Sequence, residues 1–373
     1  MENDKMIFDF AMGNPPYQKM TSDTSCTQVW PGFIDLANKL TKKESSLVHP
    51  GRWIVPKTTM KPVRDEILEN QGLKEFDYHP KDNDLFPDCS VQGGISFTNY
   101  EKDYKSDVTY YINGKKYGKY SKDEIFVSND YEKEIMTKID KNIYKENMLK
   151  RVVGNIGSMG GTEFGIEKTE DFLKKIKESK EGMKEPLKIW CSIAEGKGCK
   201  LNWYYIEKEN IKTKLTQIFN TRKILISKVG HDSFLFAGNP QIVPKNSVGK
   251  CLFIFPENDS DYDLKLIQSL FCTKTARFLM SIIQKDQYVR GFEMIPDYLY
   301  FKGELEQMGK VKSEVRAMLE DEGYKYWIDP MDKQTKAIFS DKYFYDKFGF
   351  SQKLIDYIEG KFNTKELVEE IKE

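Results

Sequence analysis

The chain has 373 residues, with 58 Lys and Arg against 58 Asp and Glu, so its formal net charge is zero. A content of 39% hydrophobic and 31% charged residues is typical of a globular protein and argues against disorder. No apolar run of about 18 residues predicts a membrane span, and no secretory signal is recognisable, so we expect a cytoplasmic protein. The six cysteines form no Cys-x-x-Cys pair and only three histidines accompany them, so we expect free thiols and no metal site.

The first part of the chain alternates between strand and helix patterns. An apolar strand at 7–10 runs into a turn at 11–17, where two consecutive prolines end it. Apolar residues at helical spacing predict helices over 30–40 and 61–71. Strand patterns occupy the segments between and after them, at 46–48, 52–56, 73–78, 94–100 and 108–120. This alternation indicates an α/β sheet.

From about residue 126 the pattern changes. Lysine- and glutamate-rich segments at 130–150 and 168–185 predict helices on either side of a glycine-rich loop, 154–161. A β-rich module is expected next, then one long helix and a charged helical tail, at 187–255, 264–283 and 305–373. The expected domains are therefore 1–125, 126–300 and 301–373.

The most informative motif is the four-residue turn Asn14-Pro15-Pro16-Tyr17. The Asn14 side-chain oxygen can accept a hydrogen bond from an exocyclic amine, and the following proline fixes the direction of the Pro15 carbonyl. The Tyr17 ring can stack on a base, which contributes roughly 1–3 kcal/mol. After a strand, such a turn lies at the carboxyl end of a sheet, where α/β proteins bind ligands. A base inside a duplex is out of reach, so it would have to flip into such a pocket.

These residues resemble the (Asn/Asp)-Pro-Pro-(Tyr/Phe) motif of adenine-N6 DNA methyltransferases of restriction–modification systems. The resemblance covers the string from Phe8 to Gln18 and the segments 53–57, 85–88 and 93–102, and continues more loosely to the C-terminus. It implies a partial, Rossmann-like methyltransferase sheet, then a mixed α+β target-recognition module and a helical tail. It also implies double-stranded DNA as partner, S-adenosylmethionine as cofactor and methyl transfer to a flipped adenine.

The resemblance also assigns roles to individual residues. The catalytic residues would be those of the motif: Asn14, Pro15, Pro16 and Tyr17. An aromatic residue before Glu-Lys would close the other side of the flipped base, with Tyr100 first and Phe97 second. Alternatively, the two are alternating strand residues that face the core and the solvent. The edge of the pocket would be formed by Pro56 and Lys57. Candidates for DNA contact in the C-terminal region are Lys228, His231, Arg277 and Arg290; for Arg277, contact with phosphate and pairing with an acid both remain open.

A basic and aromatic segment, 168–223, allows two interpretations. It carries 14 Lys or Arg against 8 Asp or Glu, and the aromatic residues interleaved with them include Trp190, Trp203, Tyr204 and Tyr205. Basic residues among aromatic ones suit a surface that faces DNA. A solvated, lysine-rich surface over an aromatic core fits the same pattern.

This sequence departs from the family pattern at the methyl-donor site. There a glycine-rich turn after the first strand holds S-adenosylmethionine, whereas only thirteen residues precede Asn14 here. The loop 154–161 is either a substitute for that turn or a flexible connection between domains. We therefore expect an adenine-specific DNA methyltransferase-like protein of a restriction–modification or phage-defence system. The alternatives are a non-catalytic DNA-binding or specificity subunit and a truncated relative, either of which would need a partner chain for the S-adenosylmethionine site. A second polypeptide could thus supply the donor-binding half or a nuclease.

Overall fold

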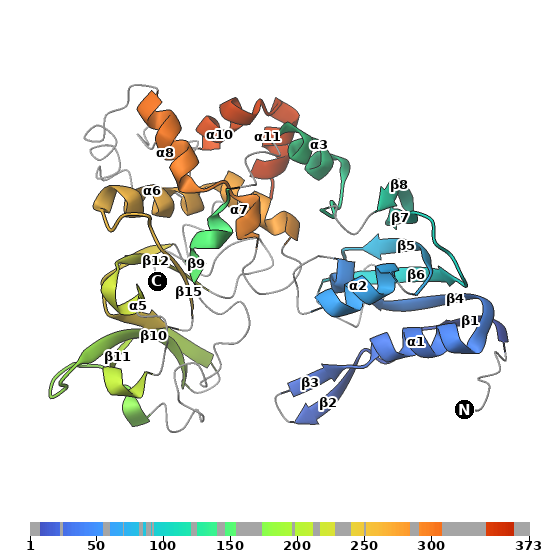
Figure 1. The fold of residues 1–373 in the computed structure, drawn as a ribbon, viewed down its shortest axis with the longest axis horizontal. Helices are drawn as coiled ribbons and strands as arrows, with labels where there is room; N and C mark the ends of the chain where they lie inside the picture. The colour runs from blue at the N-terminus through green and yellow to red at the C-terminus, as the bar shows by residue number, and fades with distance from the viewer. Residues whose placement is uncertain are drawn as a thin grey trace. The chain divides into compact units, whose positions relative to one another are not determined.

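The structure is a computed structural model that describes residues 8–22, 25–54, 60–69, 71–81, 85–86, 91, 93–120, 125–139, 146–153, 174–195, 198–211, 217–227, 240–249, 251–283, 291–307 and 341–361. The chain divides into two compact units (Figure 1). The first comprises Met1–Met136 with Ile282–Asp286, and the second comprises Thr137–Ser281 with Gln287–Glu373.

A mixed six-stranded sheet forms the centre of the first unit. Its strands are, in spatial order, β1 (Phe8–Gly13), β4 (Thr41–Pro50), β6 (Ile95–Glu101), β5 (Leu73–His79), β7 (Val108–Ile112) and β8 (Lys115–Tyr120). The pairs β1–β4 and β5–β7 are parallel, and the other neighbours are antiparallel. A hairpin of β2 (Gln18–Ser22) and β3 (Ser25–Gln28) follows β1. The first unit therefore has the α/β architecture that the sequence predicts.

Two helices, α1 (Trp30–Leu40) and α2 (Lys61–Glu69), pack on the sheet of the first unit. α1 carries a proline in its first turn. Backbone N–H groups in the first turn of a helix make no intrahelical hydrogen bond, so proline, which has no N–H, costs the helix none there. Trp30 and Ile34 point inward from α1 and join a cluster of buried residues with Leu47 of β4. Asn38 of α1 accepts a hydrogen bond from Ser45 Oγ at 2.6 Å. α1 therefore covers the face of β4 on which Ser45 and Leu47 lie.

The second unit contains two smaller sheets. One joins β11 (Gly198–Glu207), β10 (Pro186–Glu195) and β14 (Ser247–Gly249). The other joins β13 (Gln241–Val243), β12 (Lys223–Ser227), β15 (Cys251–Ile254) and β9 (Val152–Val153). Both sheets contribute to one apolar cluster, which confirms the β-rich module expected at 187–255.

The longer helices of the second unit are α6 (Asp261–Cys272), α7 (Lys274–Ile283), α8 (Tyr298–Gln307), α10 (Asp341–Phe348) and α11 (Gln352–Glu359). The single long helix expected at 264–283 was wrong, because α6 and α7 are separate helices bent by 67°. Thr273, between them, has an extended backbone, and its Oγ1 accepts from Ala276 N at 3.2 Å and so caps α7. Among the described helices, none is by itself long and apolar enough to span a membrane.

Three other sequence expectations differ from the structure. The strand expected from residue 52 is a 3₁₀ helix, η1 (Gly51–Ile54), in which the neighbours Trp53 and Ile54 are both buried. Apolar runs this short do not distinguish a strand from a helical turn. In the described part of the segment 130–150, where one helix was expected, α3 (Asp130–Lys138) ends at Lys138 and a short 3₁₀ helix, η4 (Met148–Arg151), begins at Met148. In the expected helix at 168–185, the described part has no helix after residue 175.

Candidate functional site

The Asn14–Tyr17 turn connects β1 to the β2–β3 hairpin. In the parallel register of β1 and β4, Gly13 lies opposite Leu47, so the turn leaves the carboxyl end of a parallel pair. Pro15 and Pro16 have no backbone N–H and cannot extend the ladder. The two prolines therefore end the strand, and the turn that they form lies at the edge of the sheet where α/β proteins bind ligands.

The turn is anchored at one end and open at the other. Tyr17 is half-buried and packs against the core of the first unit. Its carbonyl accepts a hydrogen bond from Val29 N at 3.1 Å, immediately before α1. Asn14 and Pro16 are exposed, and Pro15 is half-buried. The carboxamide of Asn14 is thus free to meet a ligand, while Tyr17 is held by α1 and the sheet.

The two aromatic residues expected to close the far side of the base lie on opposite faces of β6. Tyr100 is 2% exposed and belongs to the core of the first unit. Phe97 is half-buried on the other face, where its ring meets that of His79 edge-on at 5.3 Å. β6 lies beyond β4, so it is two strand spacings, roughly 10 Å, from Gly13. The structure thus places Tyr100 as a core residue and leaves Phe97 more open; stacking on a base stays a prediction.

A buried histidine that the sequence analysis did not single out lies near the carboxyl end of β4. The His49 ring stacks on Trp30 with ring centroids 4.2 Å apart, and its Nε2 is 2.9 Å from Thr98 Oγ1. Burial lowers the pKa of His49 to about 3, although a hydrogen bond with the Pro50 carbonyl acts in the opposite direction. His49 is therefore neutral at physiological pH and fixes the first residue of α1 to the sheet beside the turn. No local pattern distinguishes it from an ordinary strand residue.

The expected DNA-contacting residues are only partly placed. Arg277 on α7 is 5% exposed and donates from Nε to the carbonyl oxygen of Phe271 at 3.0 Å. This burial keeps Arg277 away from a phosphate in the present conformation. The remaining sequence candidates lie outside the described residues: Pro56, Lys57, Lys228, His231, Arg290 and the loop 154–161.

The basic and aromatic segment splits between surface and core. Trp190 and Trp203 pair across β10 and β11 on one face, with ring centroids 5.1 Å apart. Lys188, on the same face, places Nζ 4.8 Å from the centre of the Trp203 ring. Tyr204 faces the apolar core instead. Trp190 and Trp203 are half-buried and pack against the same core, so the described part of the segment fits a lysine-rich surface over an aromatic core, and its contact with DNA stays a prediction.

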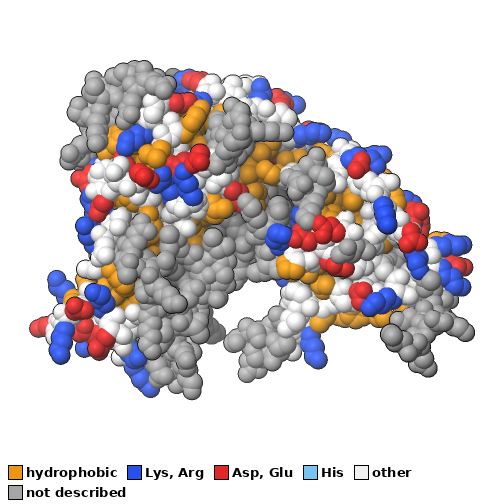
Figure 2. Space-filling model, viewed as in Figure 1, with side chains coloured by type: hydrophobic (Ala, Val, Ile, Leu, Met, Phe, Trp, Pro, Cys, Tyr) orange, Lys and Arg blue, Asp and Glu red, His pale blue; other side chains and the backbone are white. Residues whose placement is uncertain are grey.

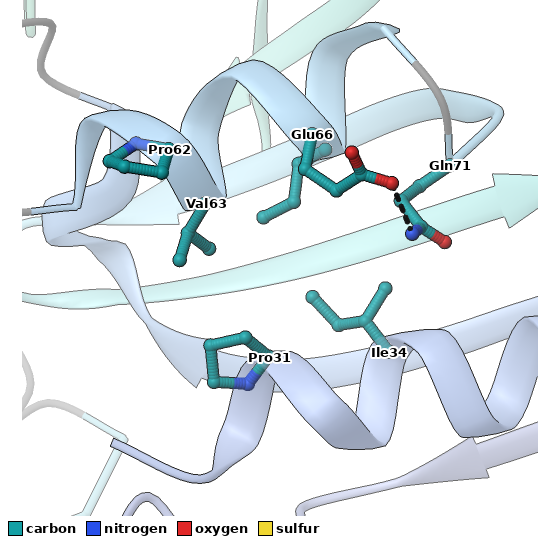
Figure 3. Close-up of a pocket in the computed structure, with 7 residues that line it drawn as sticks. Pro31, Ile34, Pro62, Val63, Glu66 and Gln71 are labelled. Carbon is teal, nitrogen blue, oxygen red and sulfur yellow. Dashed lines mark hydrogen bonds between the residues drawn. The ribbon is translucent and has the colours of Figure 1, made fainter. Parts of the chain in front are cut away.

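A mostly apolar cavity of about 350 Å³ lies between α1 and α2 (Figure 3). It is lined by Pro31 and Ile34 of α1, by four residues of α2 and by a following glutamine: Pro62, Val63, Glu66, Ile67 and Gln71. Glu66 accepts a hydrogen bond from Gln71 Nε2 at 3.0 Å, as the dashed line shows. None of the lining residues comes from the Asn14–Tyr17 turn, so this cavity is distinct from the motif.

The glycines beside the sheet of the first unit differ in the space around them. Gly51 follows β4 and Gly94 precedes β6, whereas Gly13 ends β1 and Gly114 lies between β7 and β8. A Cβ at Gly51 would lie 2.6 Å from Tyr78 Cε2, and one at Gly94 would lie 2.4 Å from the carbonyl oxygen of His79. Protein atoms therefore close Gly51 and Gly94, while no atom would lie within 4 Å of a Cβ at Gly13 or Gly114. Within the described part of the chain, no group of three or more His, Cys, Asp and Glu is arranged to hold a metal.

Comparison with known proteins places the motif in a family context. Residues 1–86 match the family model of the Eco57I restriction-modification methylase. The amino-terminal part of the chain is thus similar to restriction–modification methylases, in agreement with the resemblance inferred from the motif. No curated protein matches the sequence.

Several solved structures show weak similarity to this chain. The type IIL restriction-modification enzyme MmeI in complex with DNA has 10% identity and a TM-score of 0.40, over 95% of this chain and 55% of that one. The DrdV–DNA complex has 8% identity and a TM-score of 0.38, over 79% and 43%. The type IIG restriction endonuclease BpuSI has 10% identity and a TM-score of 0.26, over 76% and 44%. The chain thus spans about half the length of these proteins, and the TM-scores are too low to establish a shared fold.

Proposed function

We propose that this protein is the target-base part of an adenine-N6 DNA methyltransferase of a restriction–modification or phage-defence system. The observation that carries the proposal is the placement of Asn14. It is exposed at the carboxyl end of a parallel strand, inside the segment that matches restriction–modification methylases. The bound partner would be double-stranded DNA in the cytoplasm, with one adenine turned out of the helix.

The chemistry of the turn suits an aromatic amine. Asn14 Oδ1 and the Pro15 carbonyl would each accept a hydrogen bond from the adenine N6 amine. Two acceptors on one amine draw electron density toward its nitrogen and make it a better nucleophile. Tyr17, held at one edge by the core, would offer its ring for stacking on the base. Because proton loss can follow methyl transfer, no general base with a strongly shifted pKa is required.

S-adenosylmethionine would supply the methyl group in this reaction. The Phe-x-Gly-x-Gly turn that holds it in the family does not occur in this sequence. This observation favours a second candidate function, in which the chain alone is a DNA-binding or specificity subunit, or a truncated relative, without activity of its own. Both candidates share the adenine-binding turn and differ in whether a donor site is added.

The second unit would hold the DNA backbone and select the target sequence. Trp190 and Trp203 with Lys188 form a half-exposed group of rings and a cation, which suits contact with nucleic acid. Lys228, His231 and Arg290 remain candidates for the same role, and Arg277 would need to leave its buried position to join them.

Binding to flipped adenine tests the proposal without any donor. Fluorescence anisotropy compares a duplex that carries a mismatched adenine with the fully paired duplex, since a mismatched base costs less to turn out. Tyr17→Ala should weaken binding to the mismatched duplex about 5- to 150-fold, the equivalent of roughly 1–3 kcal/mol of stacking, with a smaller effect on the paired one. Tyr104→Ala, a half-buried tyrosine elsewhere in the first unit, is the matched control and should change neither affinity. Equal losses for both duplexes in Tyr17→Ala would count against a flipping pocket.

A further inference from the structure

The β2–β3 hairpin continues directly from the Asn14–Tyr17 turn. β2 begins at Gln18, the residue after Tyr17, and its first pair joins Gln18 to Gln28 at the end of β3. The Tyr17 carbonyl accepts a hydrogen bond from Val29 N at 3.1 Å, so the chain enters and leaves the hairpin at the same place. The hairpin is therefore a direct extension of the turn that carries the motif.

The base of the hairpin is fixed to the core of the first unit. Gln28 Oε1 accepts a hydrogen bond from Trp30 Nε1 at 3.0 Å. Trp30 is fully buried, and its ring stacks on that of His49 in β4 with centroids 4.2 Å apart. These contacts connect the last residue of β3 to the sheet through the indole of α1. The position of the hairpin relative to the turn is therefore set by the fold of the first unit.

The far end of the hairpin points away from the sheet. Figure 1 shows β2 and β3 extending past the start of α1, on the side of the sheet where β4 ends. β1 and β4 are parallel, so the Asn14–Tyr17 turn leaves β1 on this same side. DNA that offers an adenine to the turn has to approach this edge of the sheet. The hairpin therefore lies where that DNA would be bound.

One large apolar residue lies on this otherwise polar hairpin. Met20 is 68% exposed, three residues after Tyr17 and so roughly 10 Å further along β2. The other residues of the two strands are all polar or small: Gln18, Lys19, Thr21, Ser22, Ser25, Cys26, Thr27 and Gln28. Figure 2 shows hydrophobic side chains gathered along α1, where each has apolar neighbours. Met20 has no large apolar neighbour in its hairpin, so it does not form the wide apolar patch that binds a protein partner.

We infer that the β2–β3 hairpin enters the DNA beside the flipped adenine and that Met20 fills the space which this base leaves in the stack; the inference rests on the proposed function. Turning a base out of the helix removes its stacking contacts, which costs free energy. Methionine is one of the apolar side chains that DNA-binding proteins insert between base steps. Its unbranched, flexible side chain adapts to an irregular space. Met20 would therefore lower the cost of flipping and favour the state of the DNA that the turn binds.

The opposite face of the hairpin suits the DNA backbone. Successive side chains of a strand point to opposite faces, so Lys19 lies on the face away from Met20. Lys19 pairs with Thr27 in the register of β2 and β3, and both residues are exposed. An ammonium and a hydroxyl can both donate to phosphate oxygens, and such contacts position a protein on DNA without reading its sequence. One face of the hairpin thus offers a wedge, and the other offers phosphate contacts.

Fluorescence anisotropy with the full chain tests the inference on three duplexes of equal length. One is fully paired, one carries a mismatched adenine, and one has an abasic site, where the stack has a gap but no base can reach the turn. Met20→Ala should weaken binding to the abasic and mismatched duplexes about tenfold each, near the low end of what burial of a methionine side chain contributes. Tyr17→Ala should leave binding to the abasic duplex unchanged, because that duplex has no base to stack on Tyr17. Lys19→Gln should weaken binding to all three duplexes alike and reduce the salt slope by about one.

Met20→Leu and Met12→Ala are the matched controls. Leucine keeps an apolar side chain of similar volume, so Met20→Leu should bind all three duplexes nearly as tightly as the parent chain does. Met12 is another exposed methionine of the first unit, but it lies on β1 outside the hairpin, so Met12→Ala should keep the parental affinities. Both positions are exposed, so the thermal midpoints should stay within a few degrees of that of the parent chain.

Two results would each overturn the inference: parental affinity of Met20→Ala for the abasic duplex, or a loss in Met20→Leu or Met12→Ala equal to that in Met20→Ala. The abasic duplex carries no adenine at the tested position, so its result does not depend on that of the adenine-binding experiment above, and either experiment can fail alone. A parent chain that binds none of the duplexes would overturn both this inference and the proposed function.

Discussion

A neutral network of the first unit and an ion pair of the second show two ways to bury polar side chains. Beneath α1, the ring of His49 lies between Thr98 and Ser96, and Trp53 donates to Ser96 Oγ at 2.9 Å. The second unit buries two opposite charges side by side. Arg151 donates to Asp297 at 2.6 Å, and both side chains are less than 10% exposed.

This difference predicts which change destabilises each unit. A buried neutral network is stable only while its titratable member stays uncharged, because an isolated buried charge is costly. In a buried ion pair each charge stabilises the other, so removal of one partner leaves an uncompensated buried charge and lowers stability. Acid should therefore weaken the first unit through His49, whereas loss of a single partner should weaken the second through Arg151 or Asp297.

The largest expected effect is the loss of the first unit in acid. The pKa of His49 is about 3 in the fold, against about 6.5 in an unfolded chain. The unfolded state therefore takes up a proton first as pH falls. The contribution of His49 to stability is fully present above about pH 6.5 and is lost as pH falls toward 3, by up to about 5 kcal/mol. His49→Phe keeps a ring against Trp30 and should lower stability at pH 7 but flatten this acid dependence.

The measurement is urea denaturation from pH 7.5 to 4, followed by the fluorescence of Trp30 and Trp53. The three other tryptophans are replaced by phenylalanine in every variant to make the signal specific to the first unit: Trp190, Trp203 and Trp327. His79→Gln is the matched control, because His79 lies on the opposite face of the sheet, near Phe97. If the stability of His49→Phe still falls with pH as in the parent chain, or if His79→Gln removes that fall, a group other than His49 causes the acid sensitivity of the first unit.

The second largest effect concerns the ion pairs of the second unit. Arg151→Met would leave Asp297 buried without its guanidinium partner, at a cost of about 3–5 kcal/mol. Glu257, which also accepts from Arg151 at 3.0 Å, is exposed and contributes less. The double variant Arg151→Met, Asp297→Leu removes both buried charges and should recover part of the loss.

Hydrogen exchange in the peptides that cover β12 and β15 measures this loss in the second unit. Lys342→Met is the control, since the Lys342–Asp346 pair of the second unit is exposed on both sides and should contribute less than about 1 kcal/mol. A double variant less stable than Arg151→Met alone would mean that Asp297 acts through its hydrogen bond to Leu299 N rather than through the ion pair.

The sequence predicts the local elements of the first unit better than their arrangement. Periodicity identifies α1, α2, β5 and β6 closely, because each has an apolar pattern of its own length. It does not reveal that β6 lies between β4 and β5, since strand order depends on long-range pairing. The assignment of Tyr100 over Phe97 depends on the same information: only the register shows that Tyr100 faces the core.

The turn itself is predictable because its chemistry is local. Two prolines after an apolar strand fix where β1 ends, and Asn14 and Tyr17 follow from the motif. His49 and Asp341 could not be found in this way. Asp341 accepts hydrogen bonds from the first backbone amides of α7, 66 and 67 residues earlier in the chain, and no local signal connects the two segments.

The smallest of the three stability effects has the opposite sign to that of His49. Asp341 is fully buried, and burial raises its pKa to about 6, with a further contribution from Glu359. Hydrogen bonds from Thr275 Oγ1 and from the amides of Lys274 and Thr275 oppose this rise but do not cancel it. The folded state therefore holds a proton at a pH where the unfolded state has lost it. The contribution is fully present below about pH 4 and is lost as pH rises through 6, by about 3 kcal/mol at most.

The variant Asp341→Asn separates the pH dependence caused by Asp341 from that caused by the other titratable groups of the second unit. Because an amide does not titrate, hydrogen exchange in β12 and β15 should vary less between pH 4.5 and 7 in the variant than in the parent chain, after correction for intrinsic rates. Glu359 also pairs with Lys274 and accepts from Tyr345 at 2.7 Å, so the charges next to Asp341 stay in place. Asp346→Asn, at an exposed pair with Lys342, should keep the parental dependence. If Asp341→Asn also keeps the parental pH dependence, the hydrogen bonds from the α7 amides hold Asp341 ionised. The pH dependence of the second unit would then come from its ion pairs.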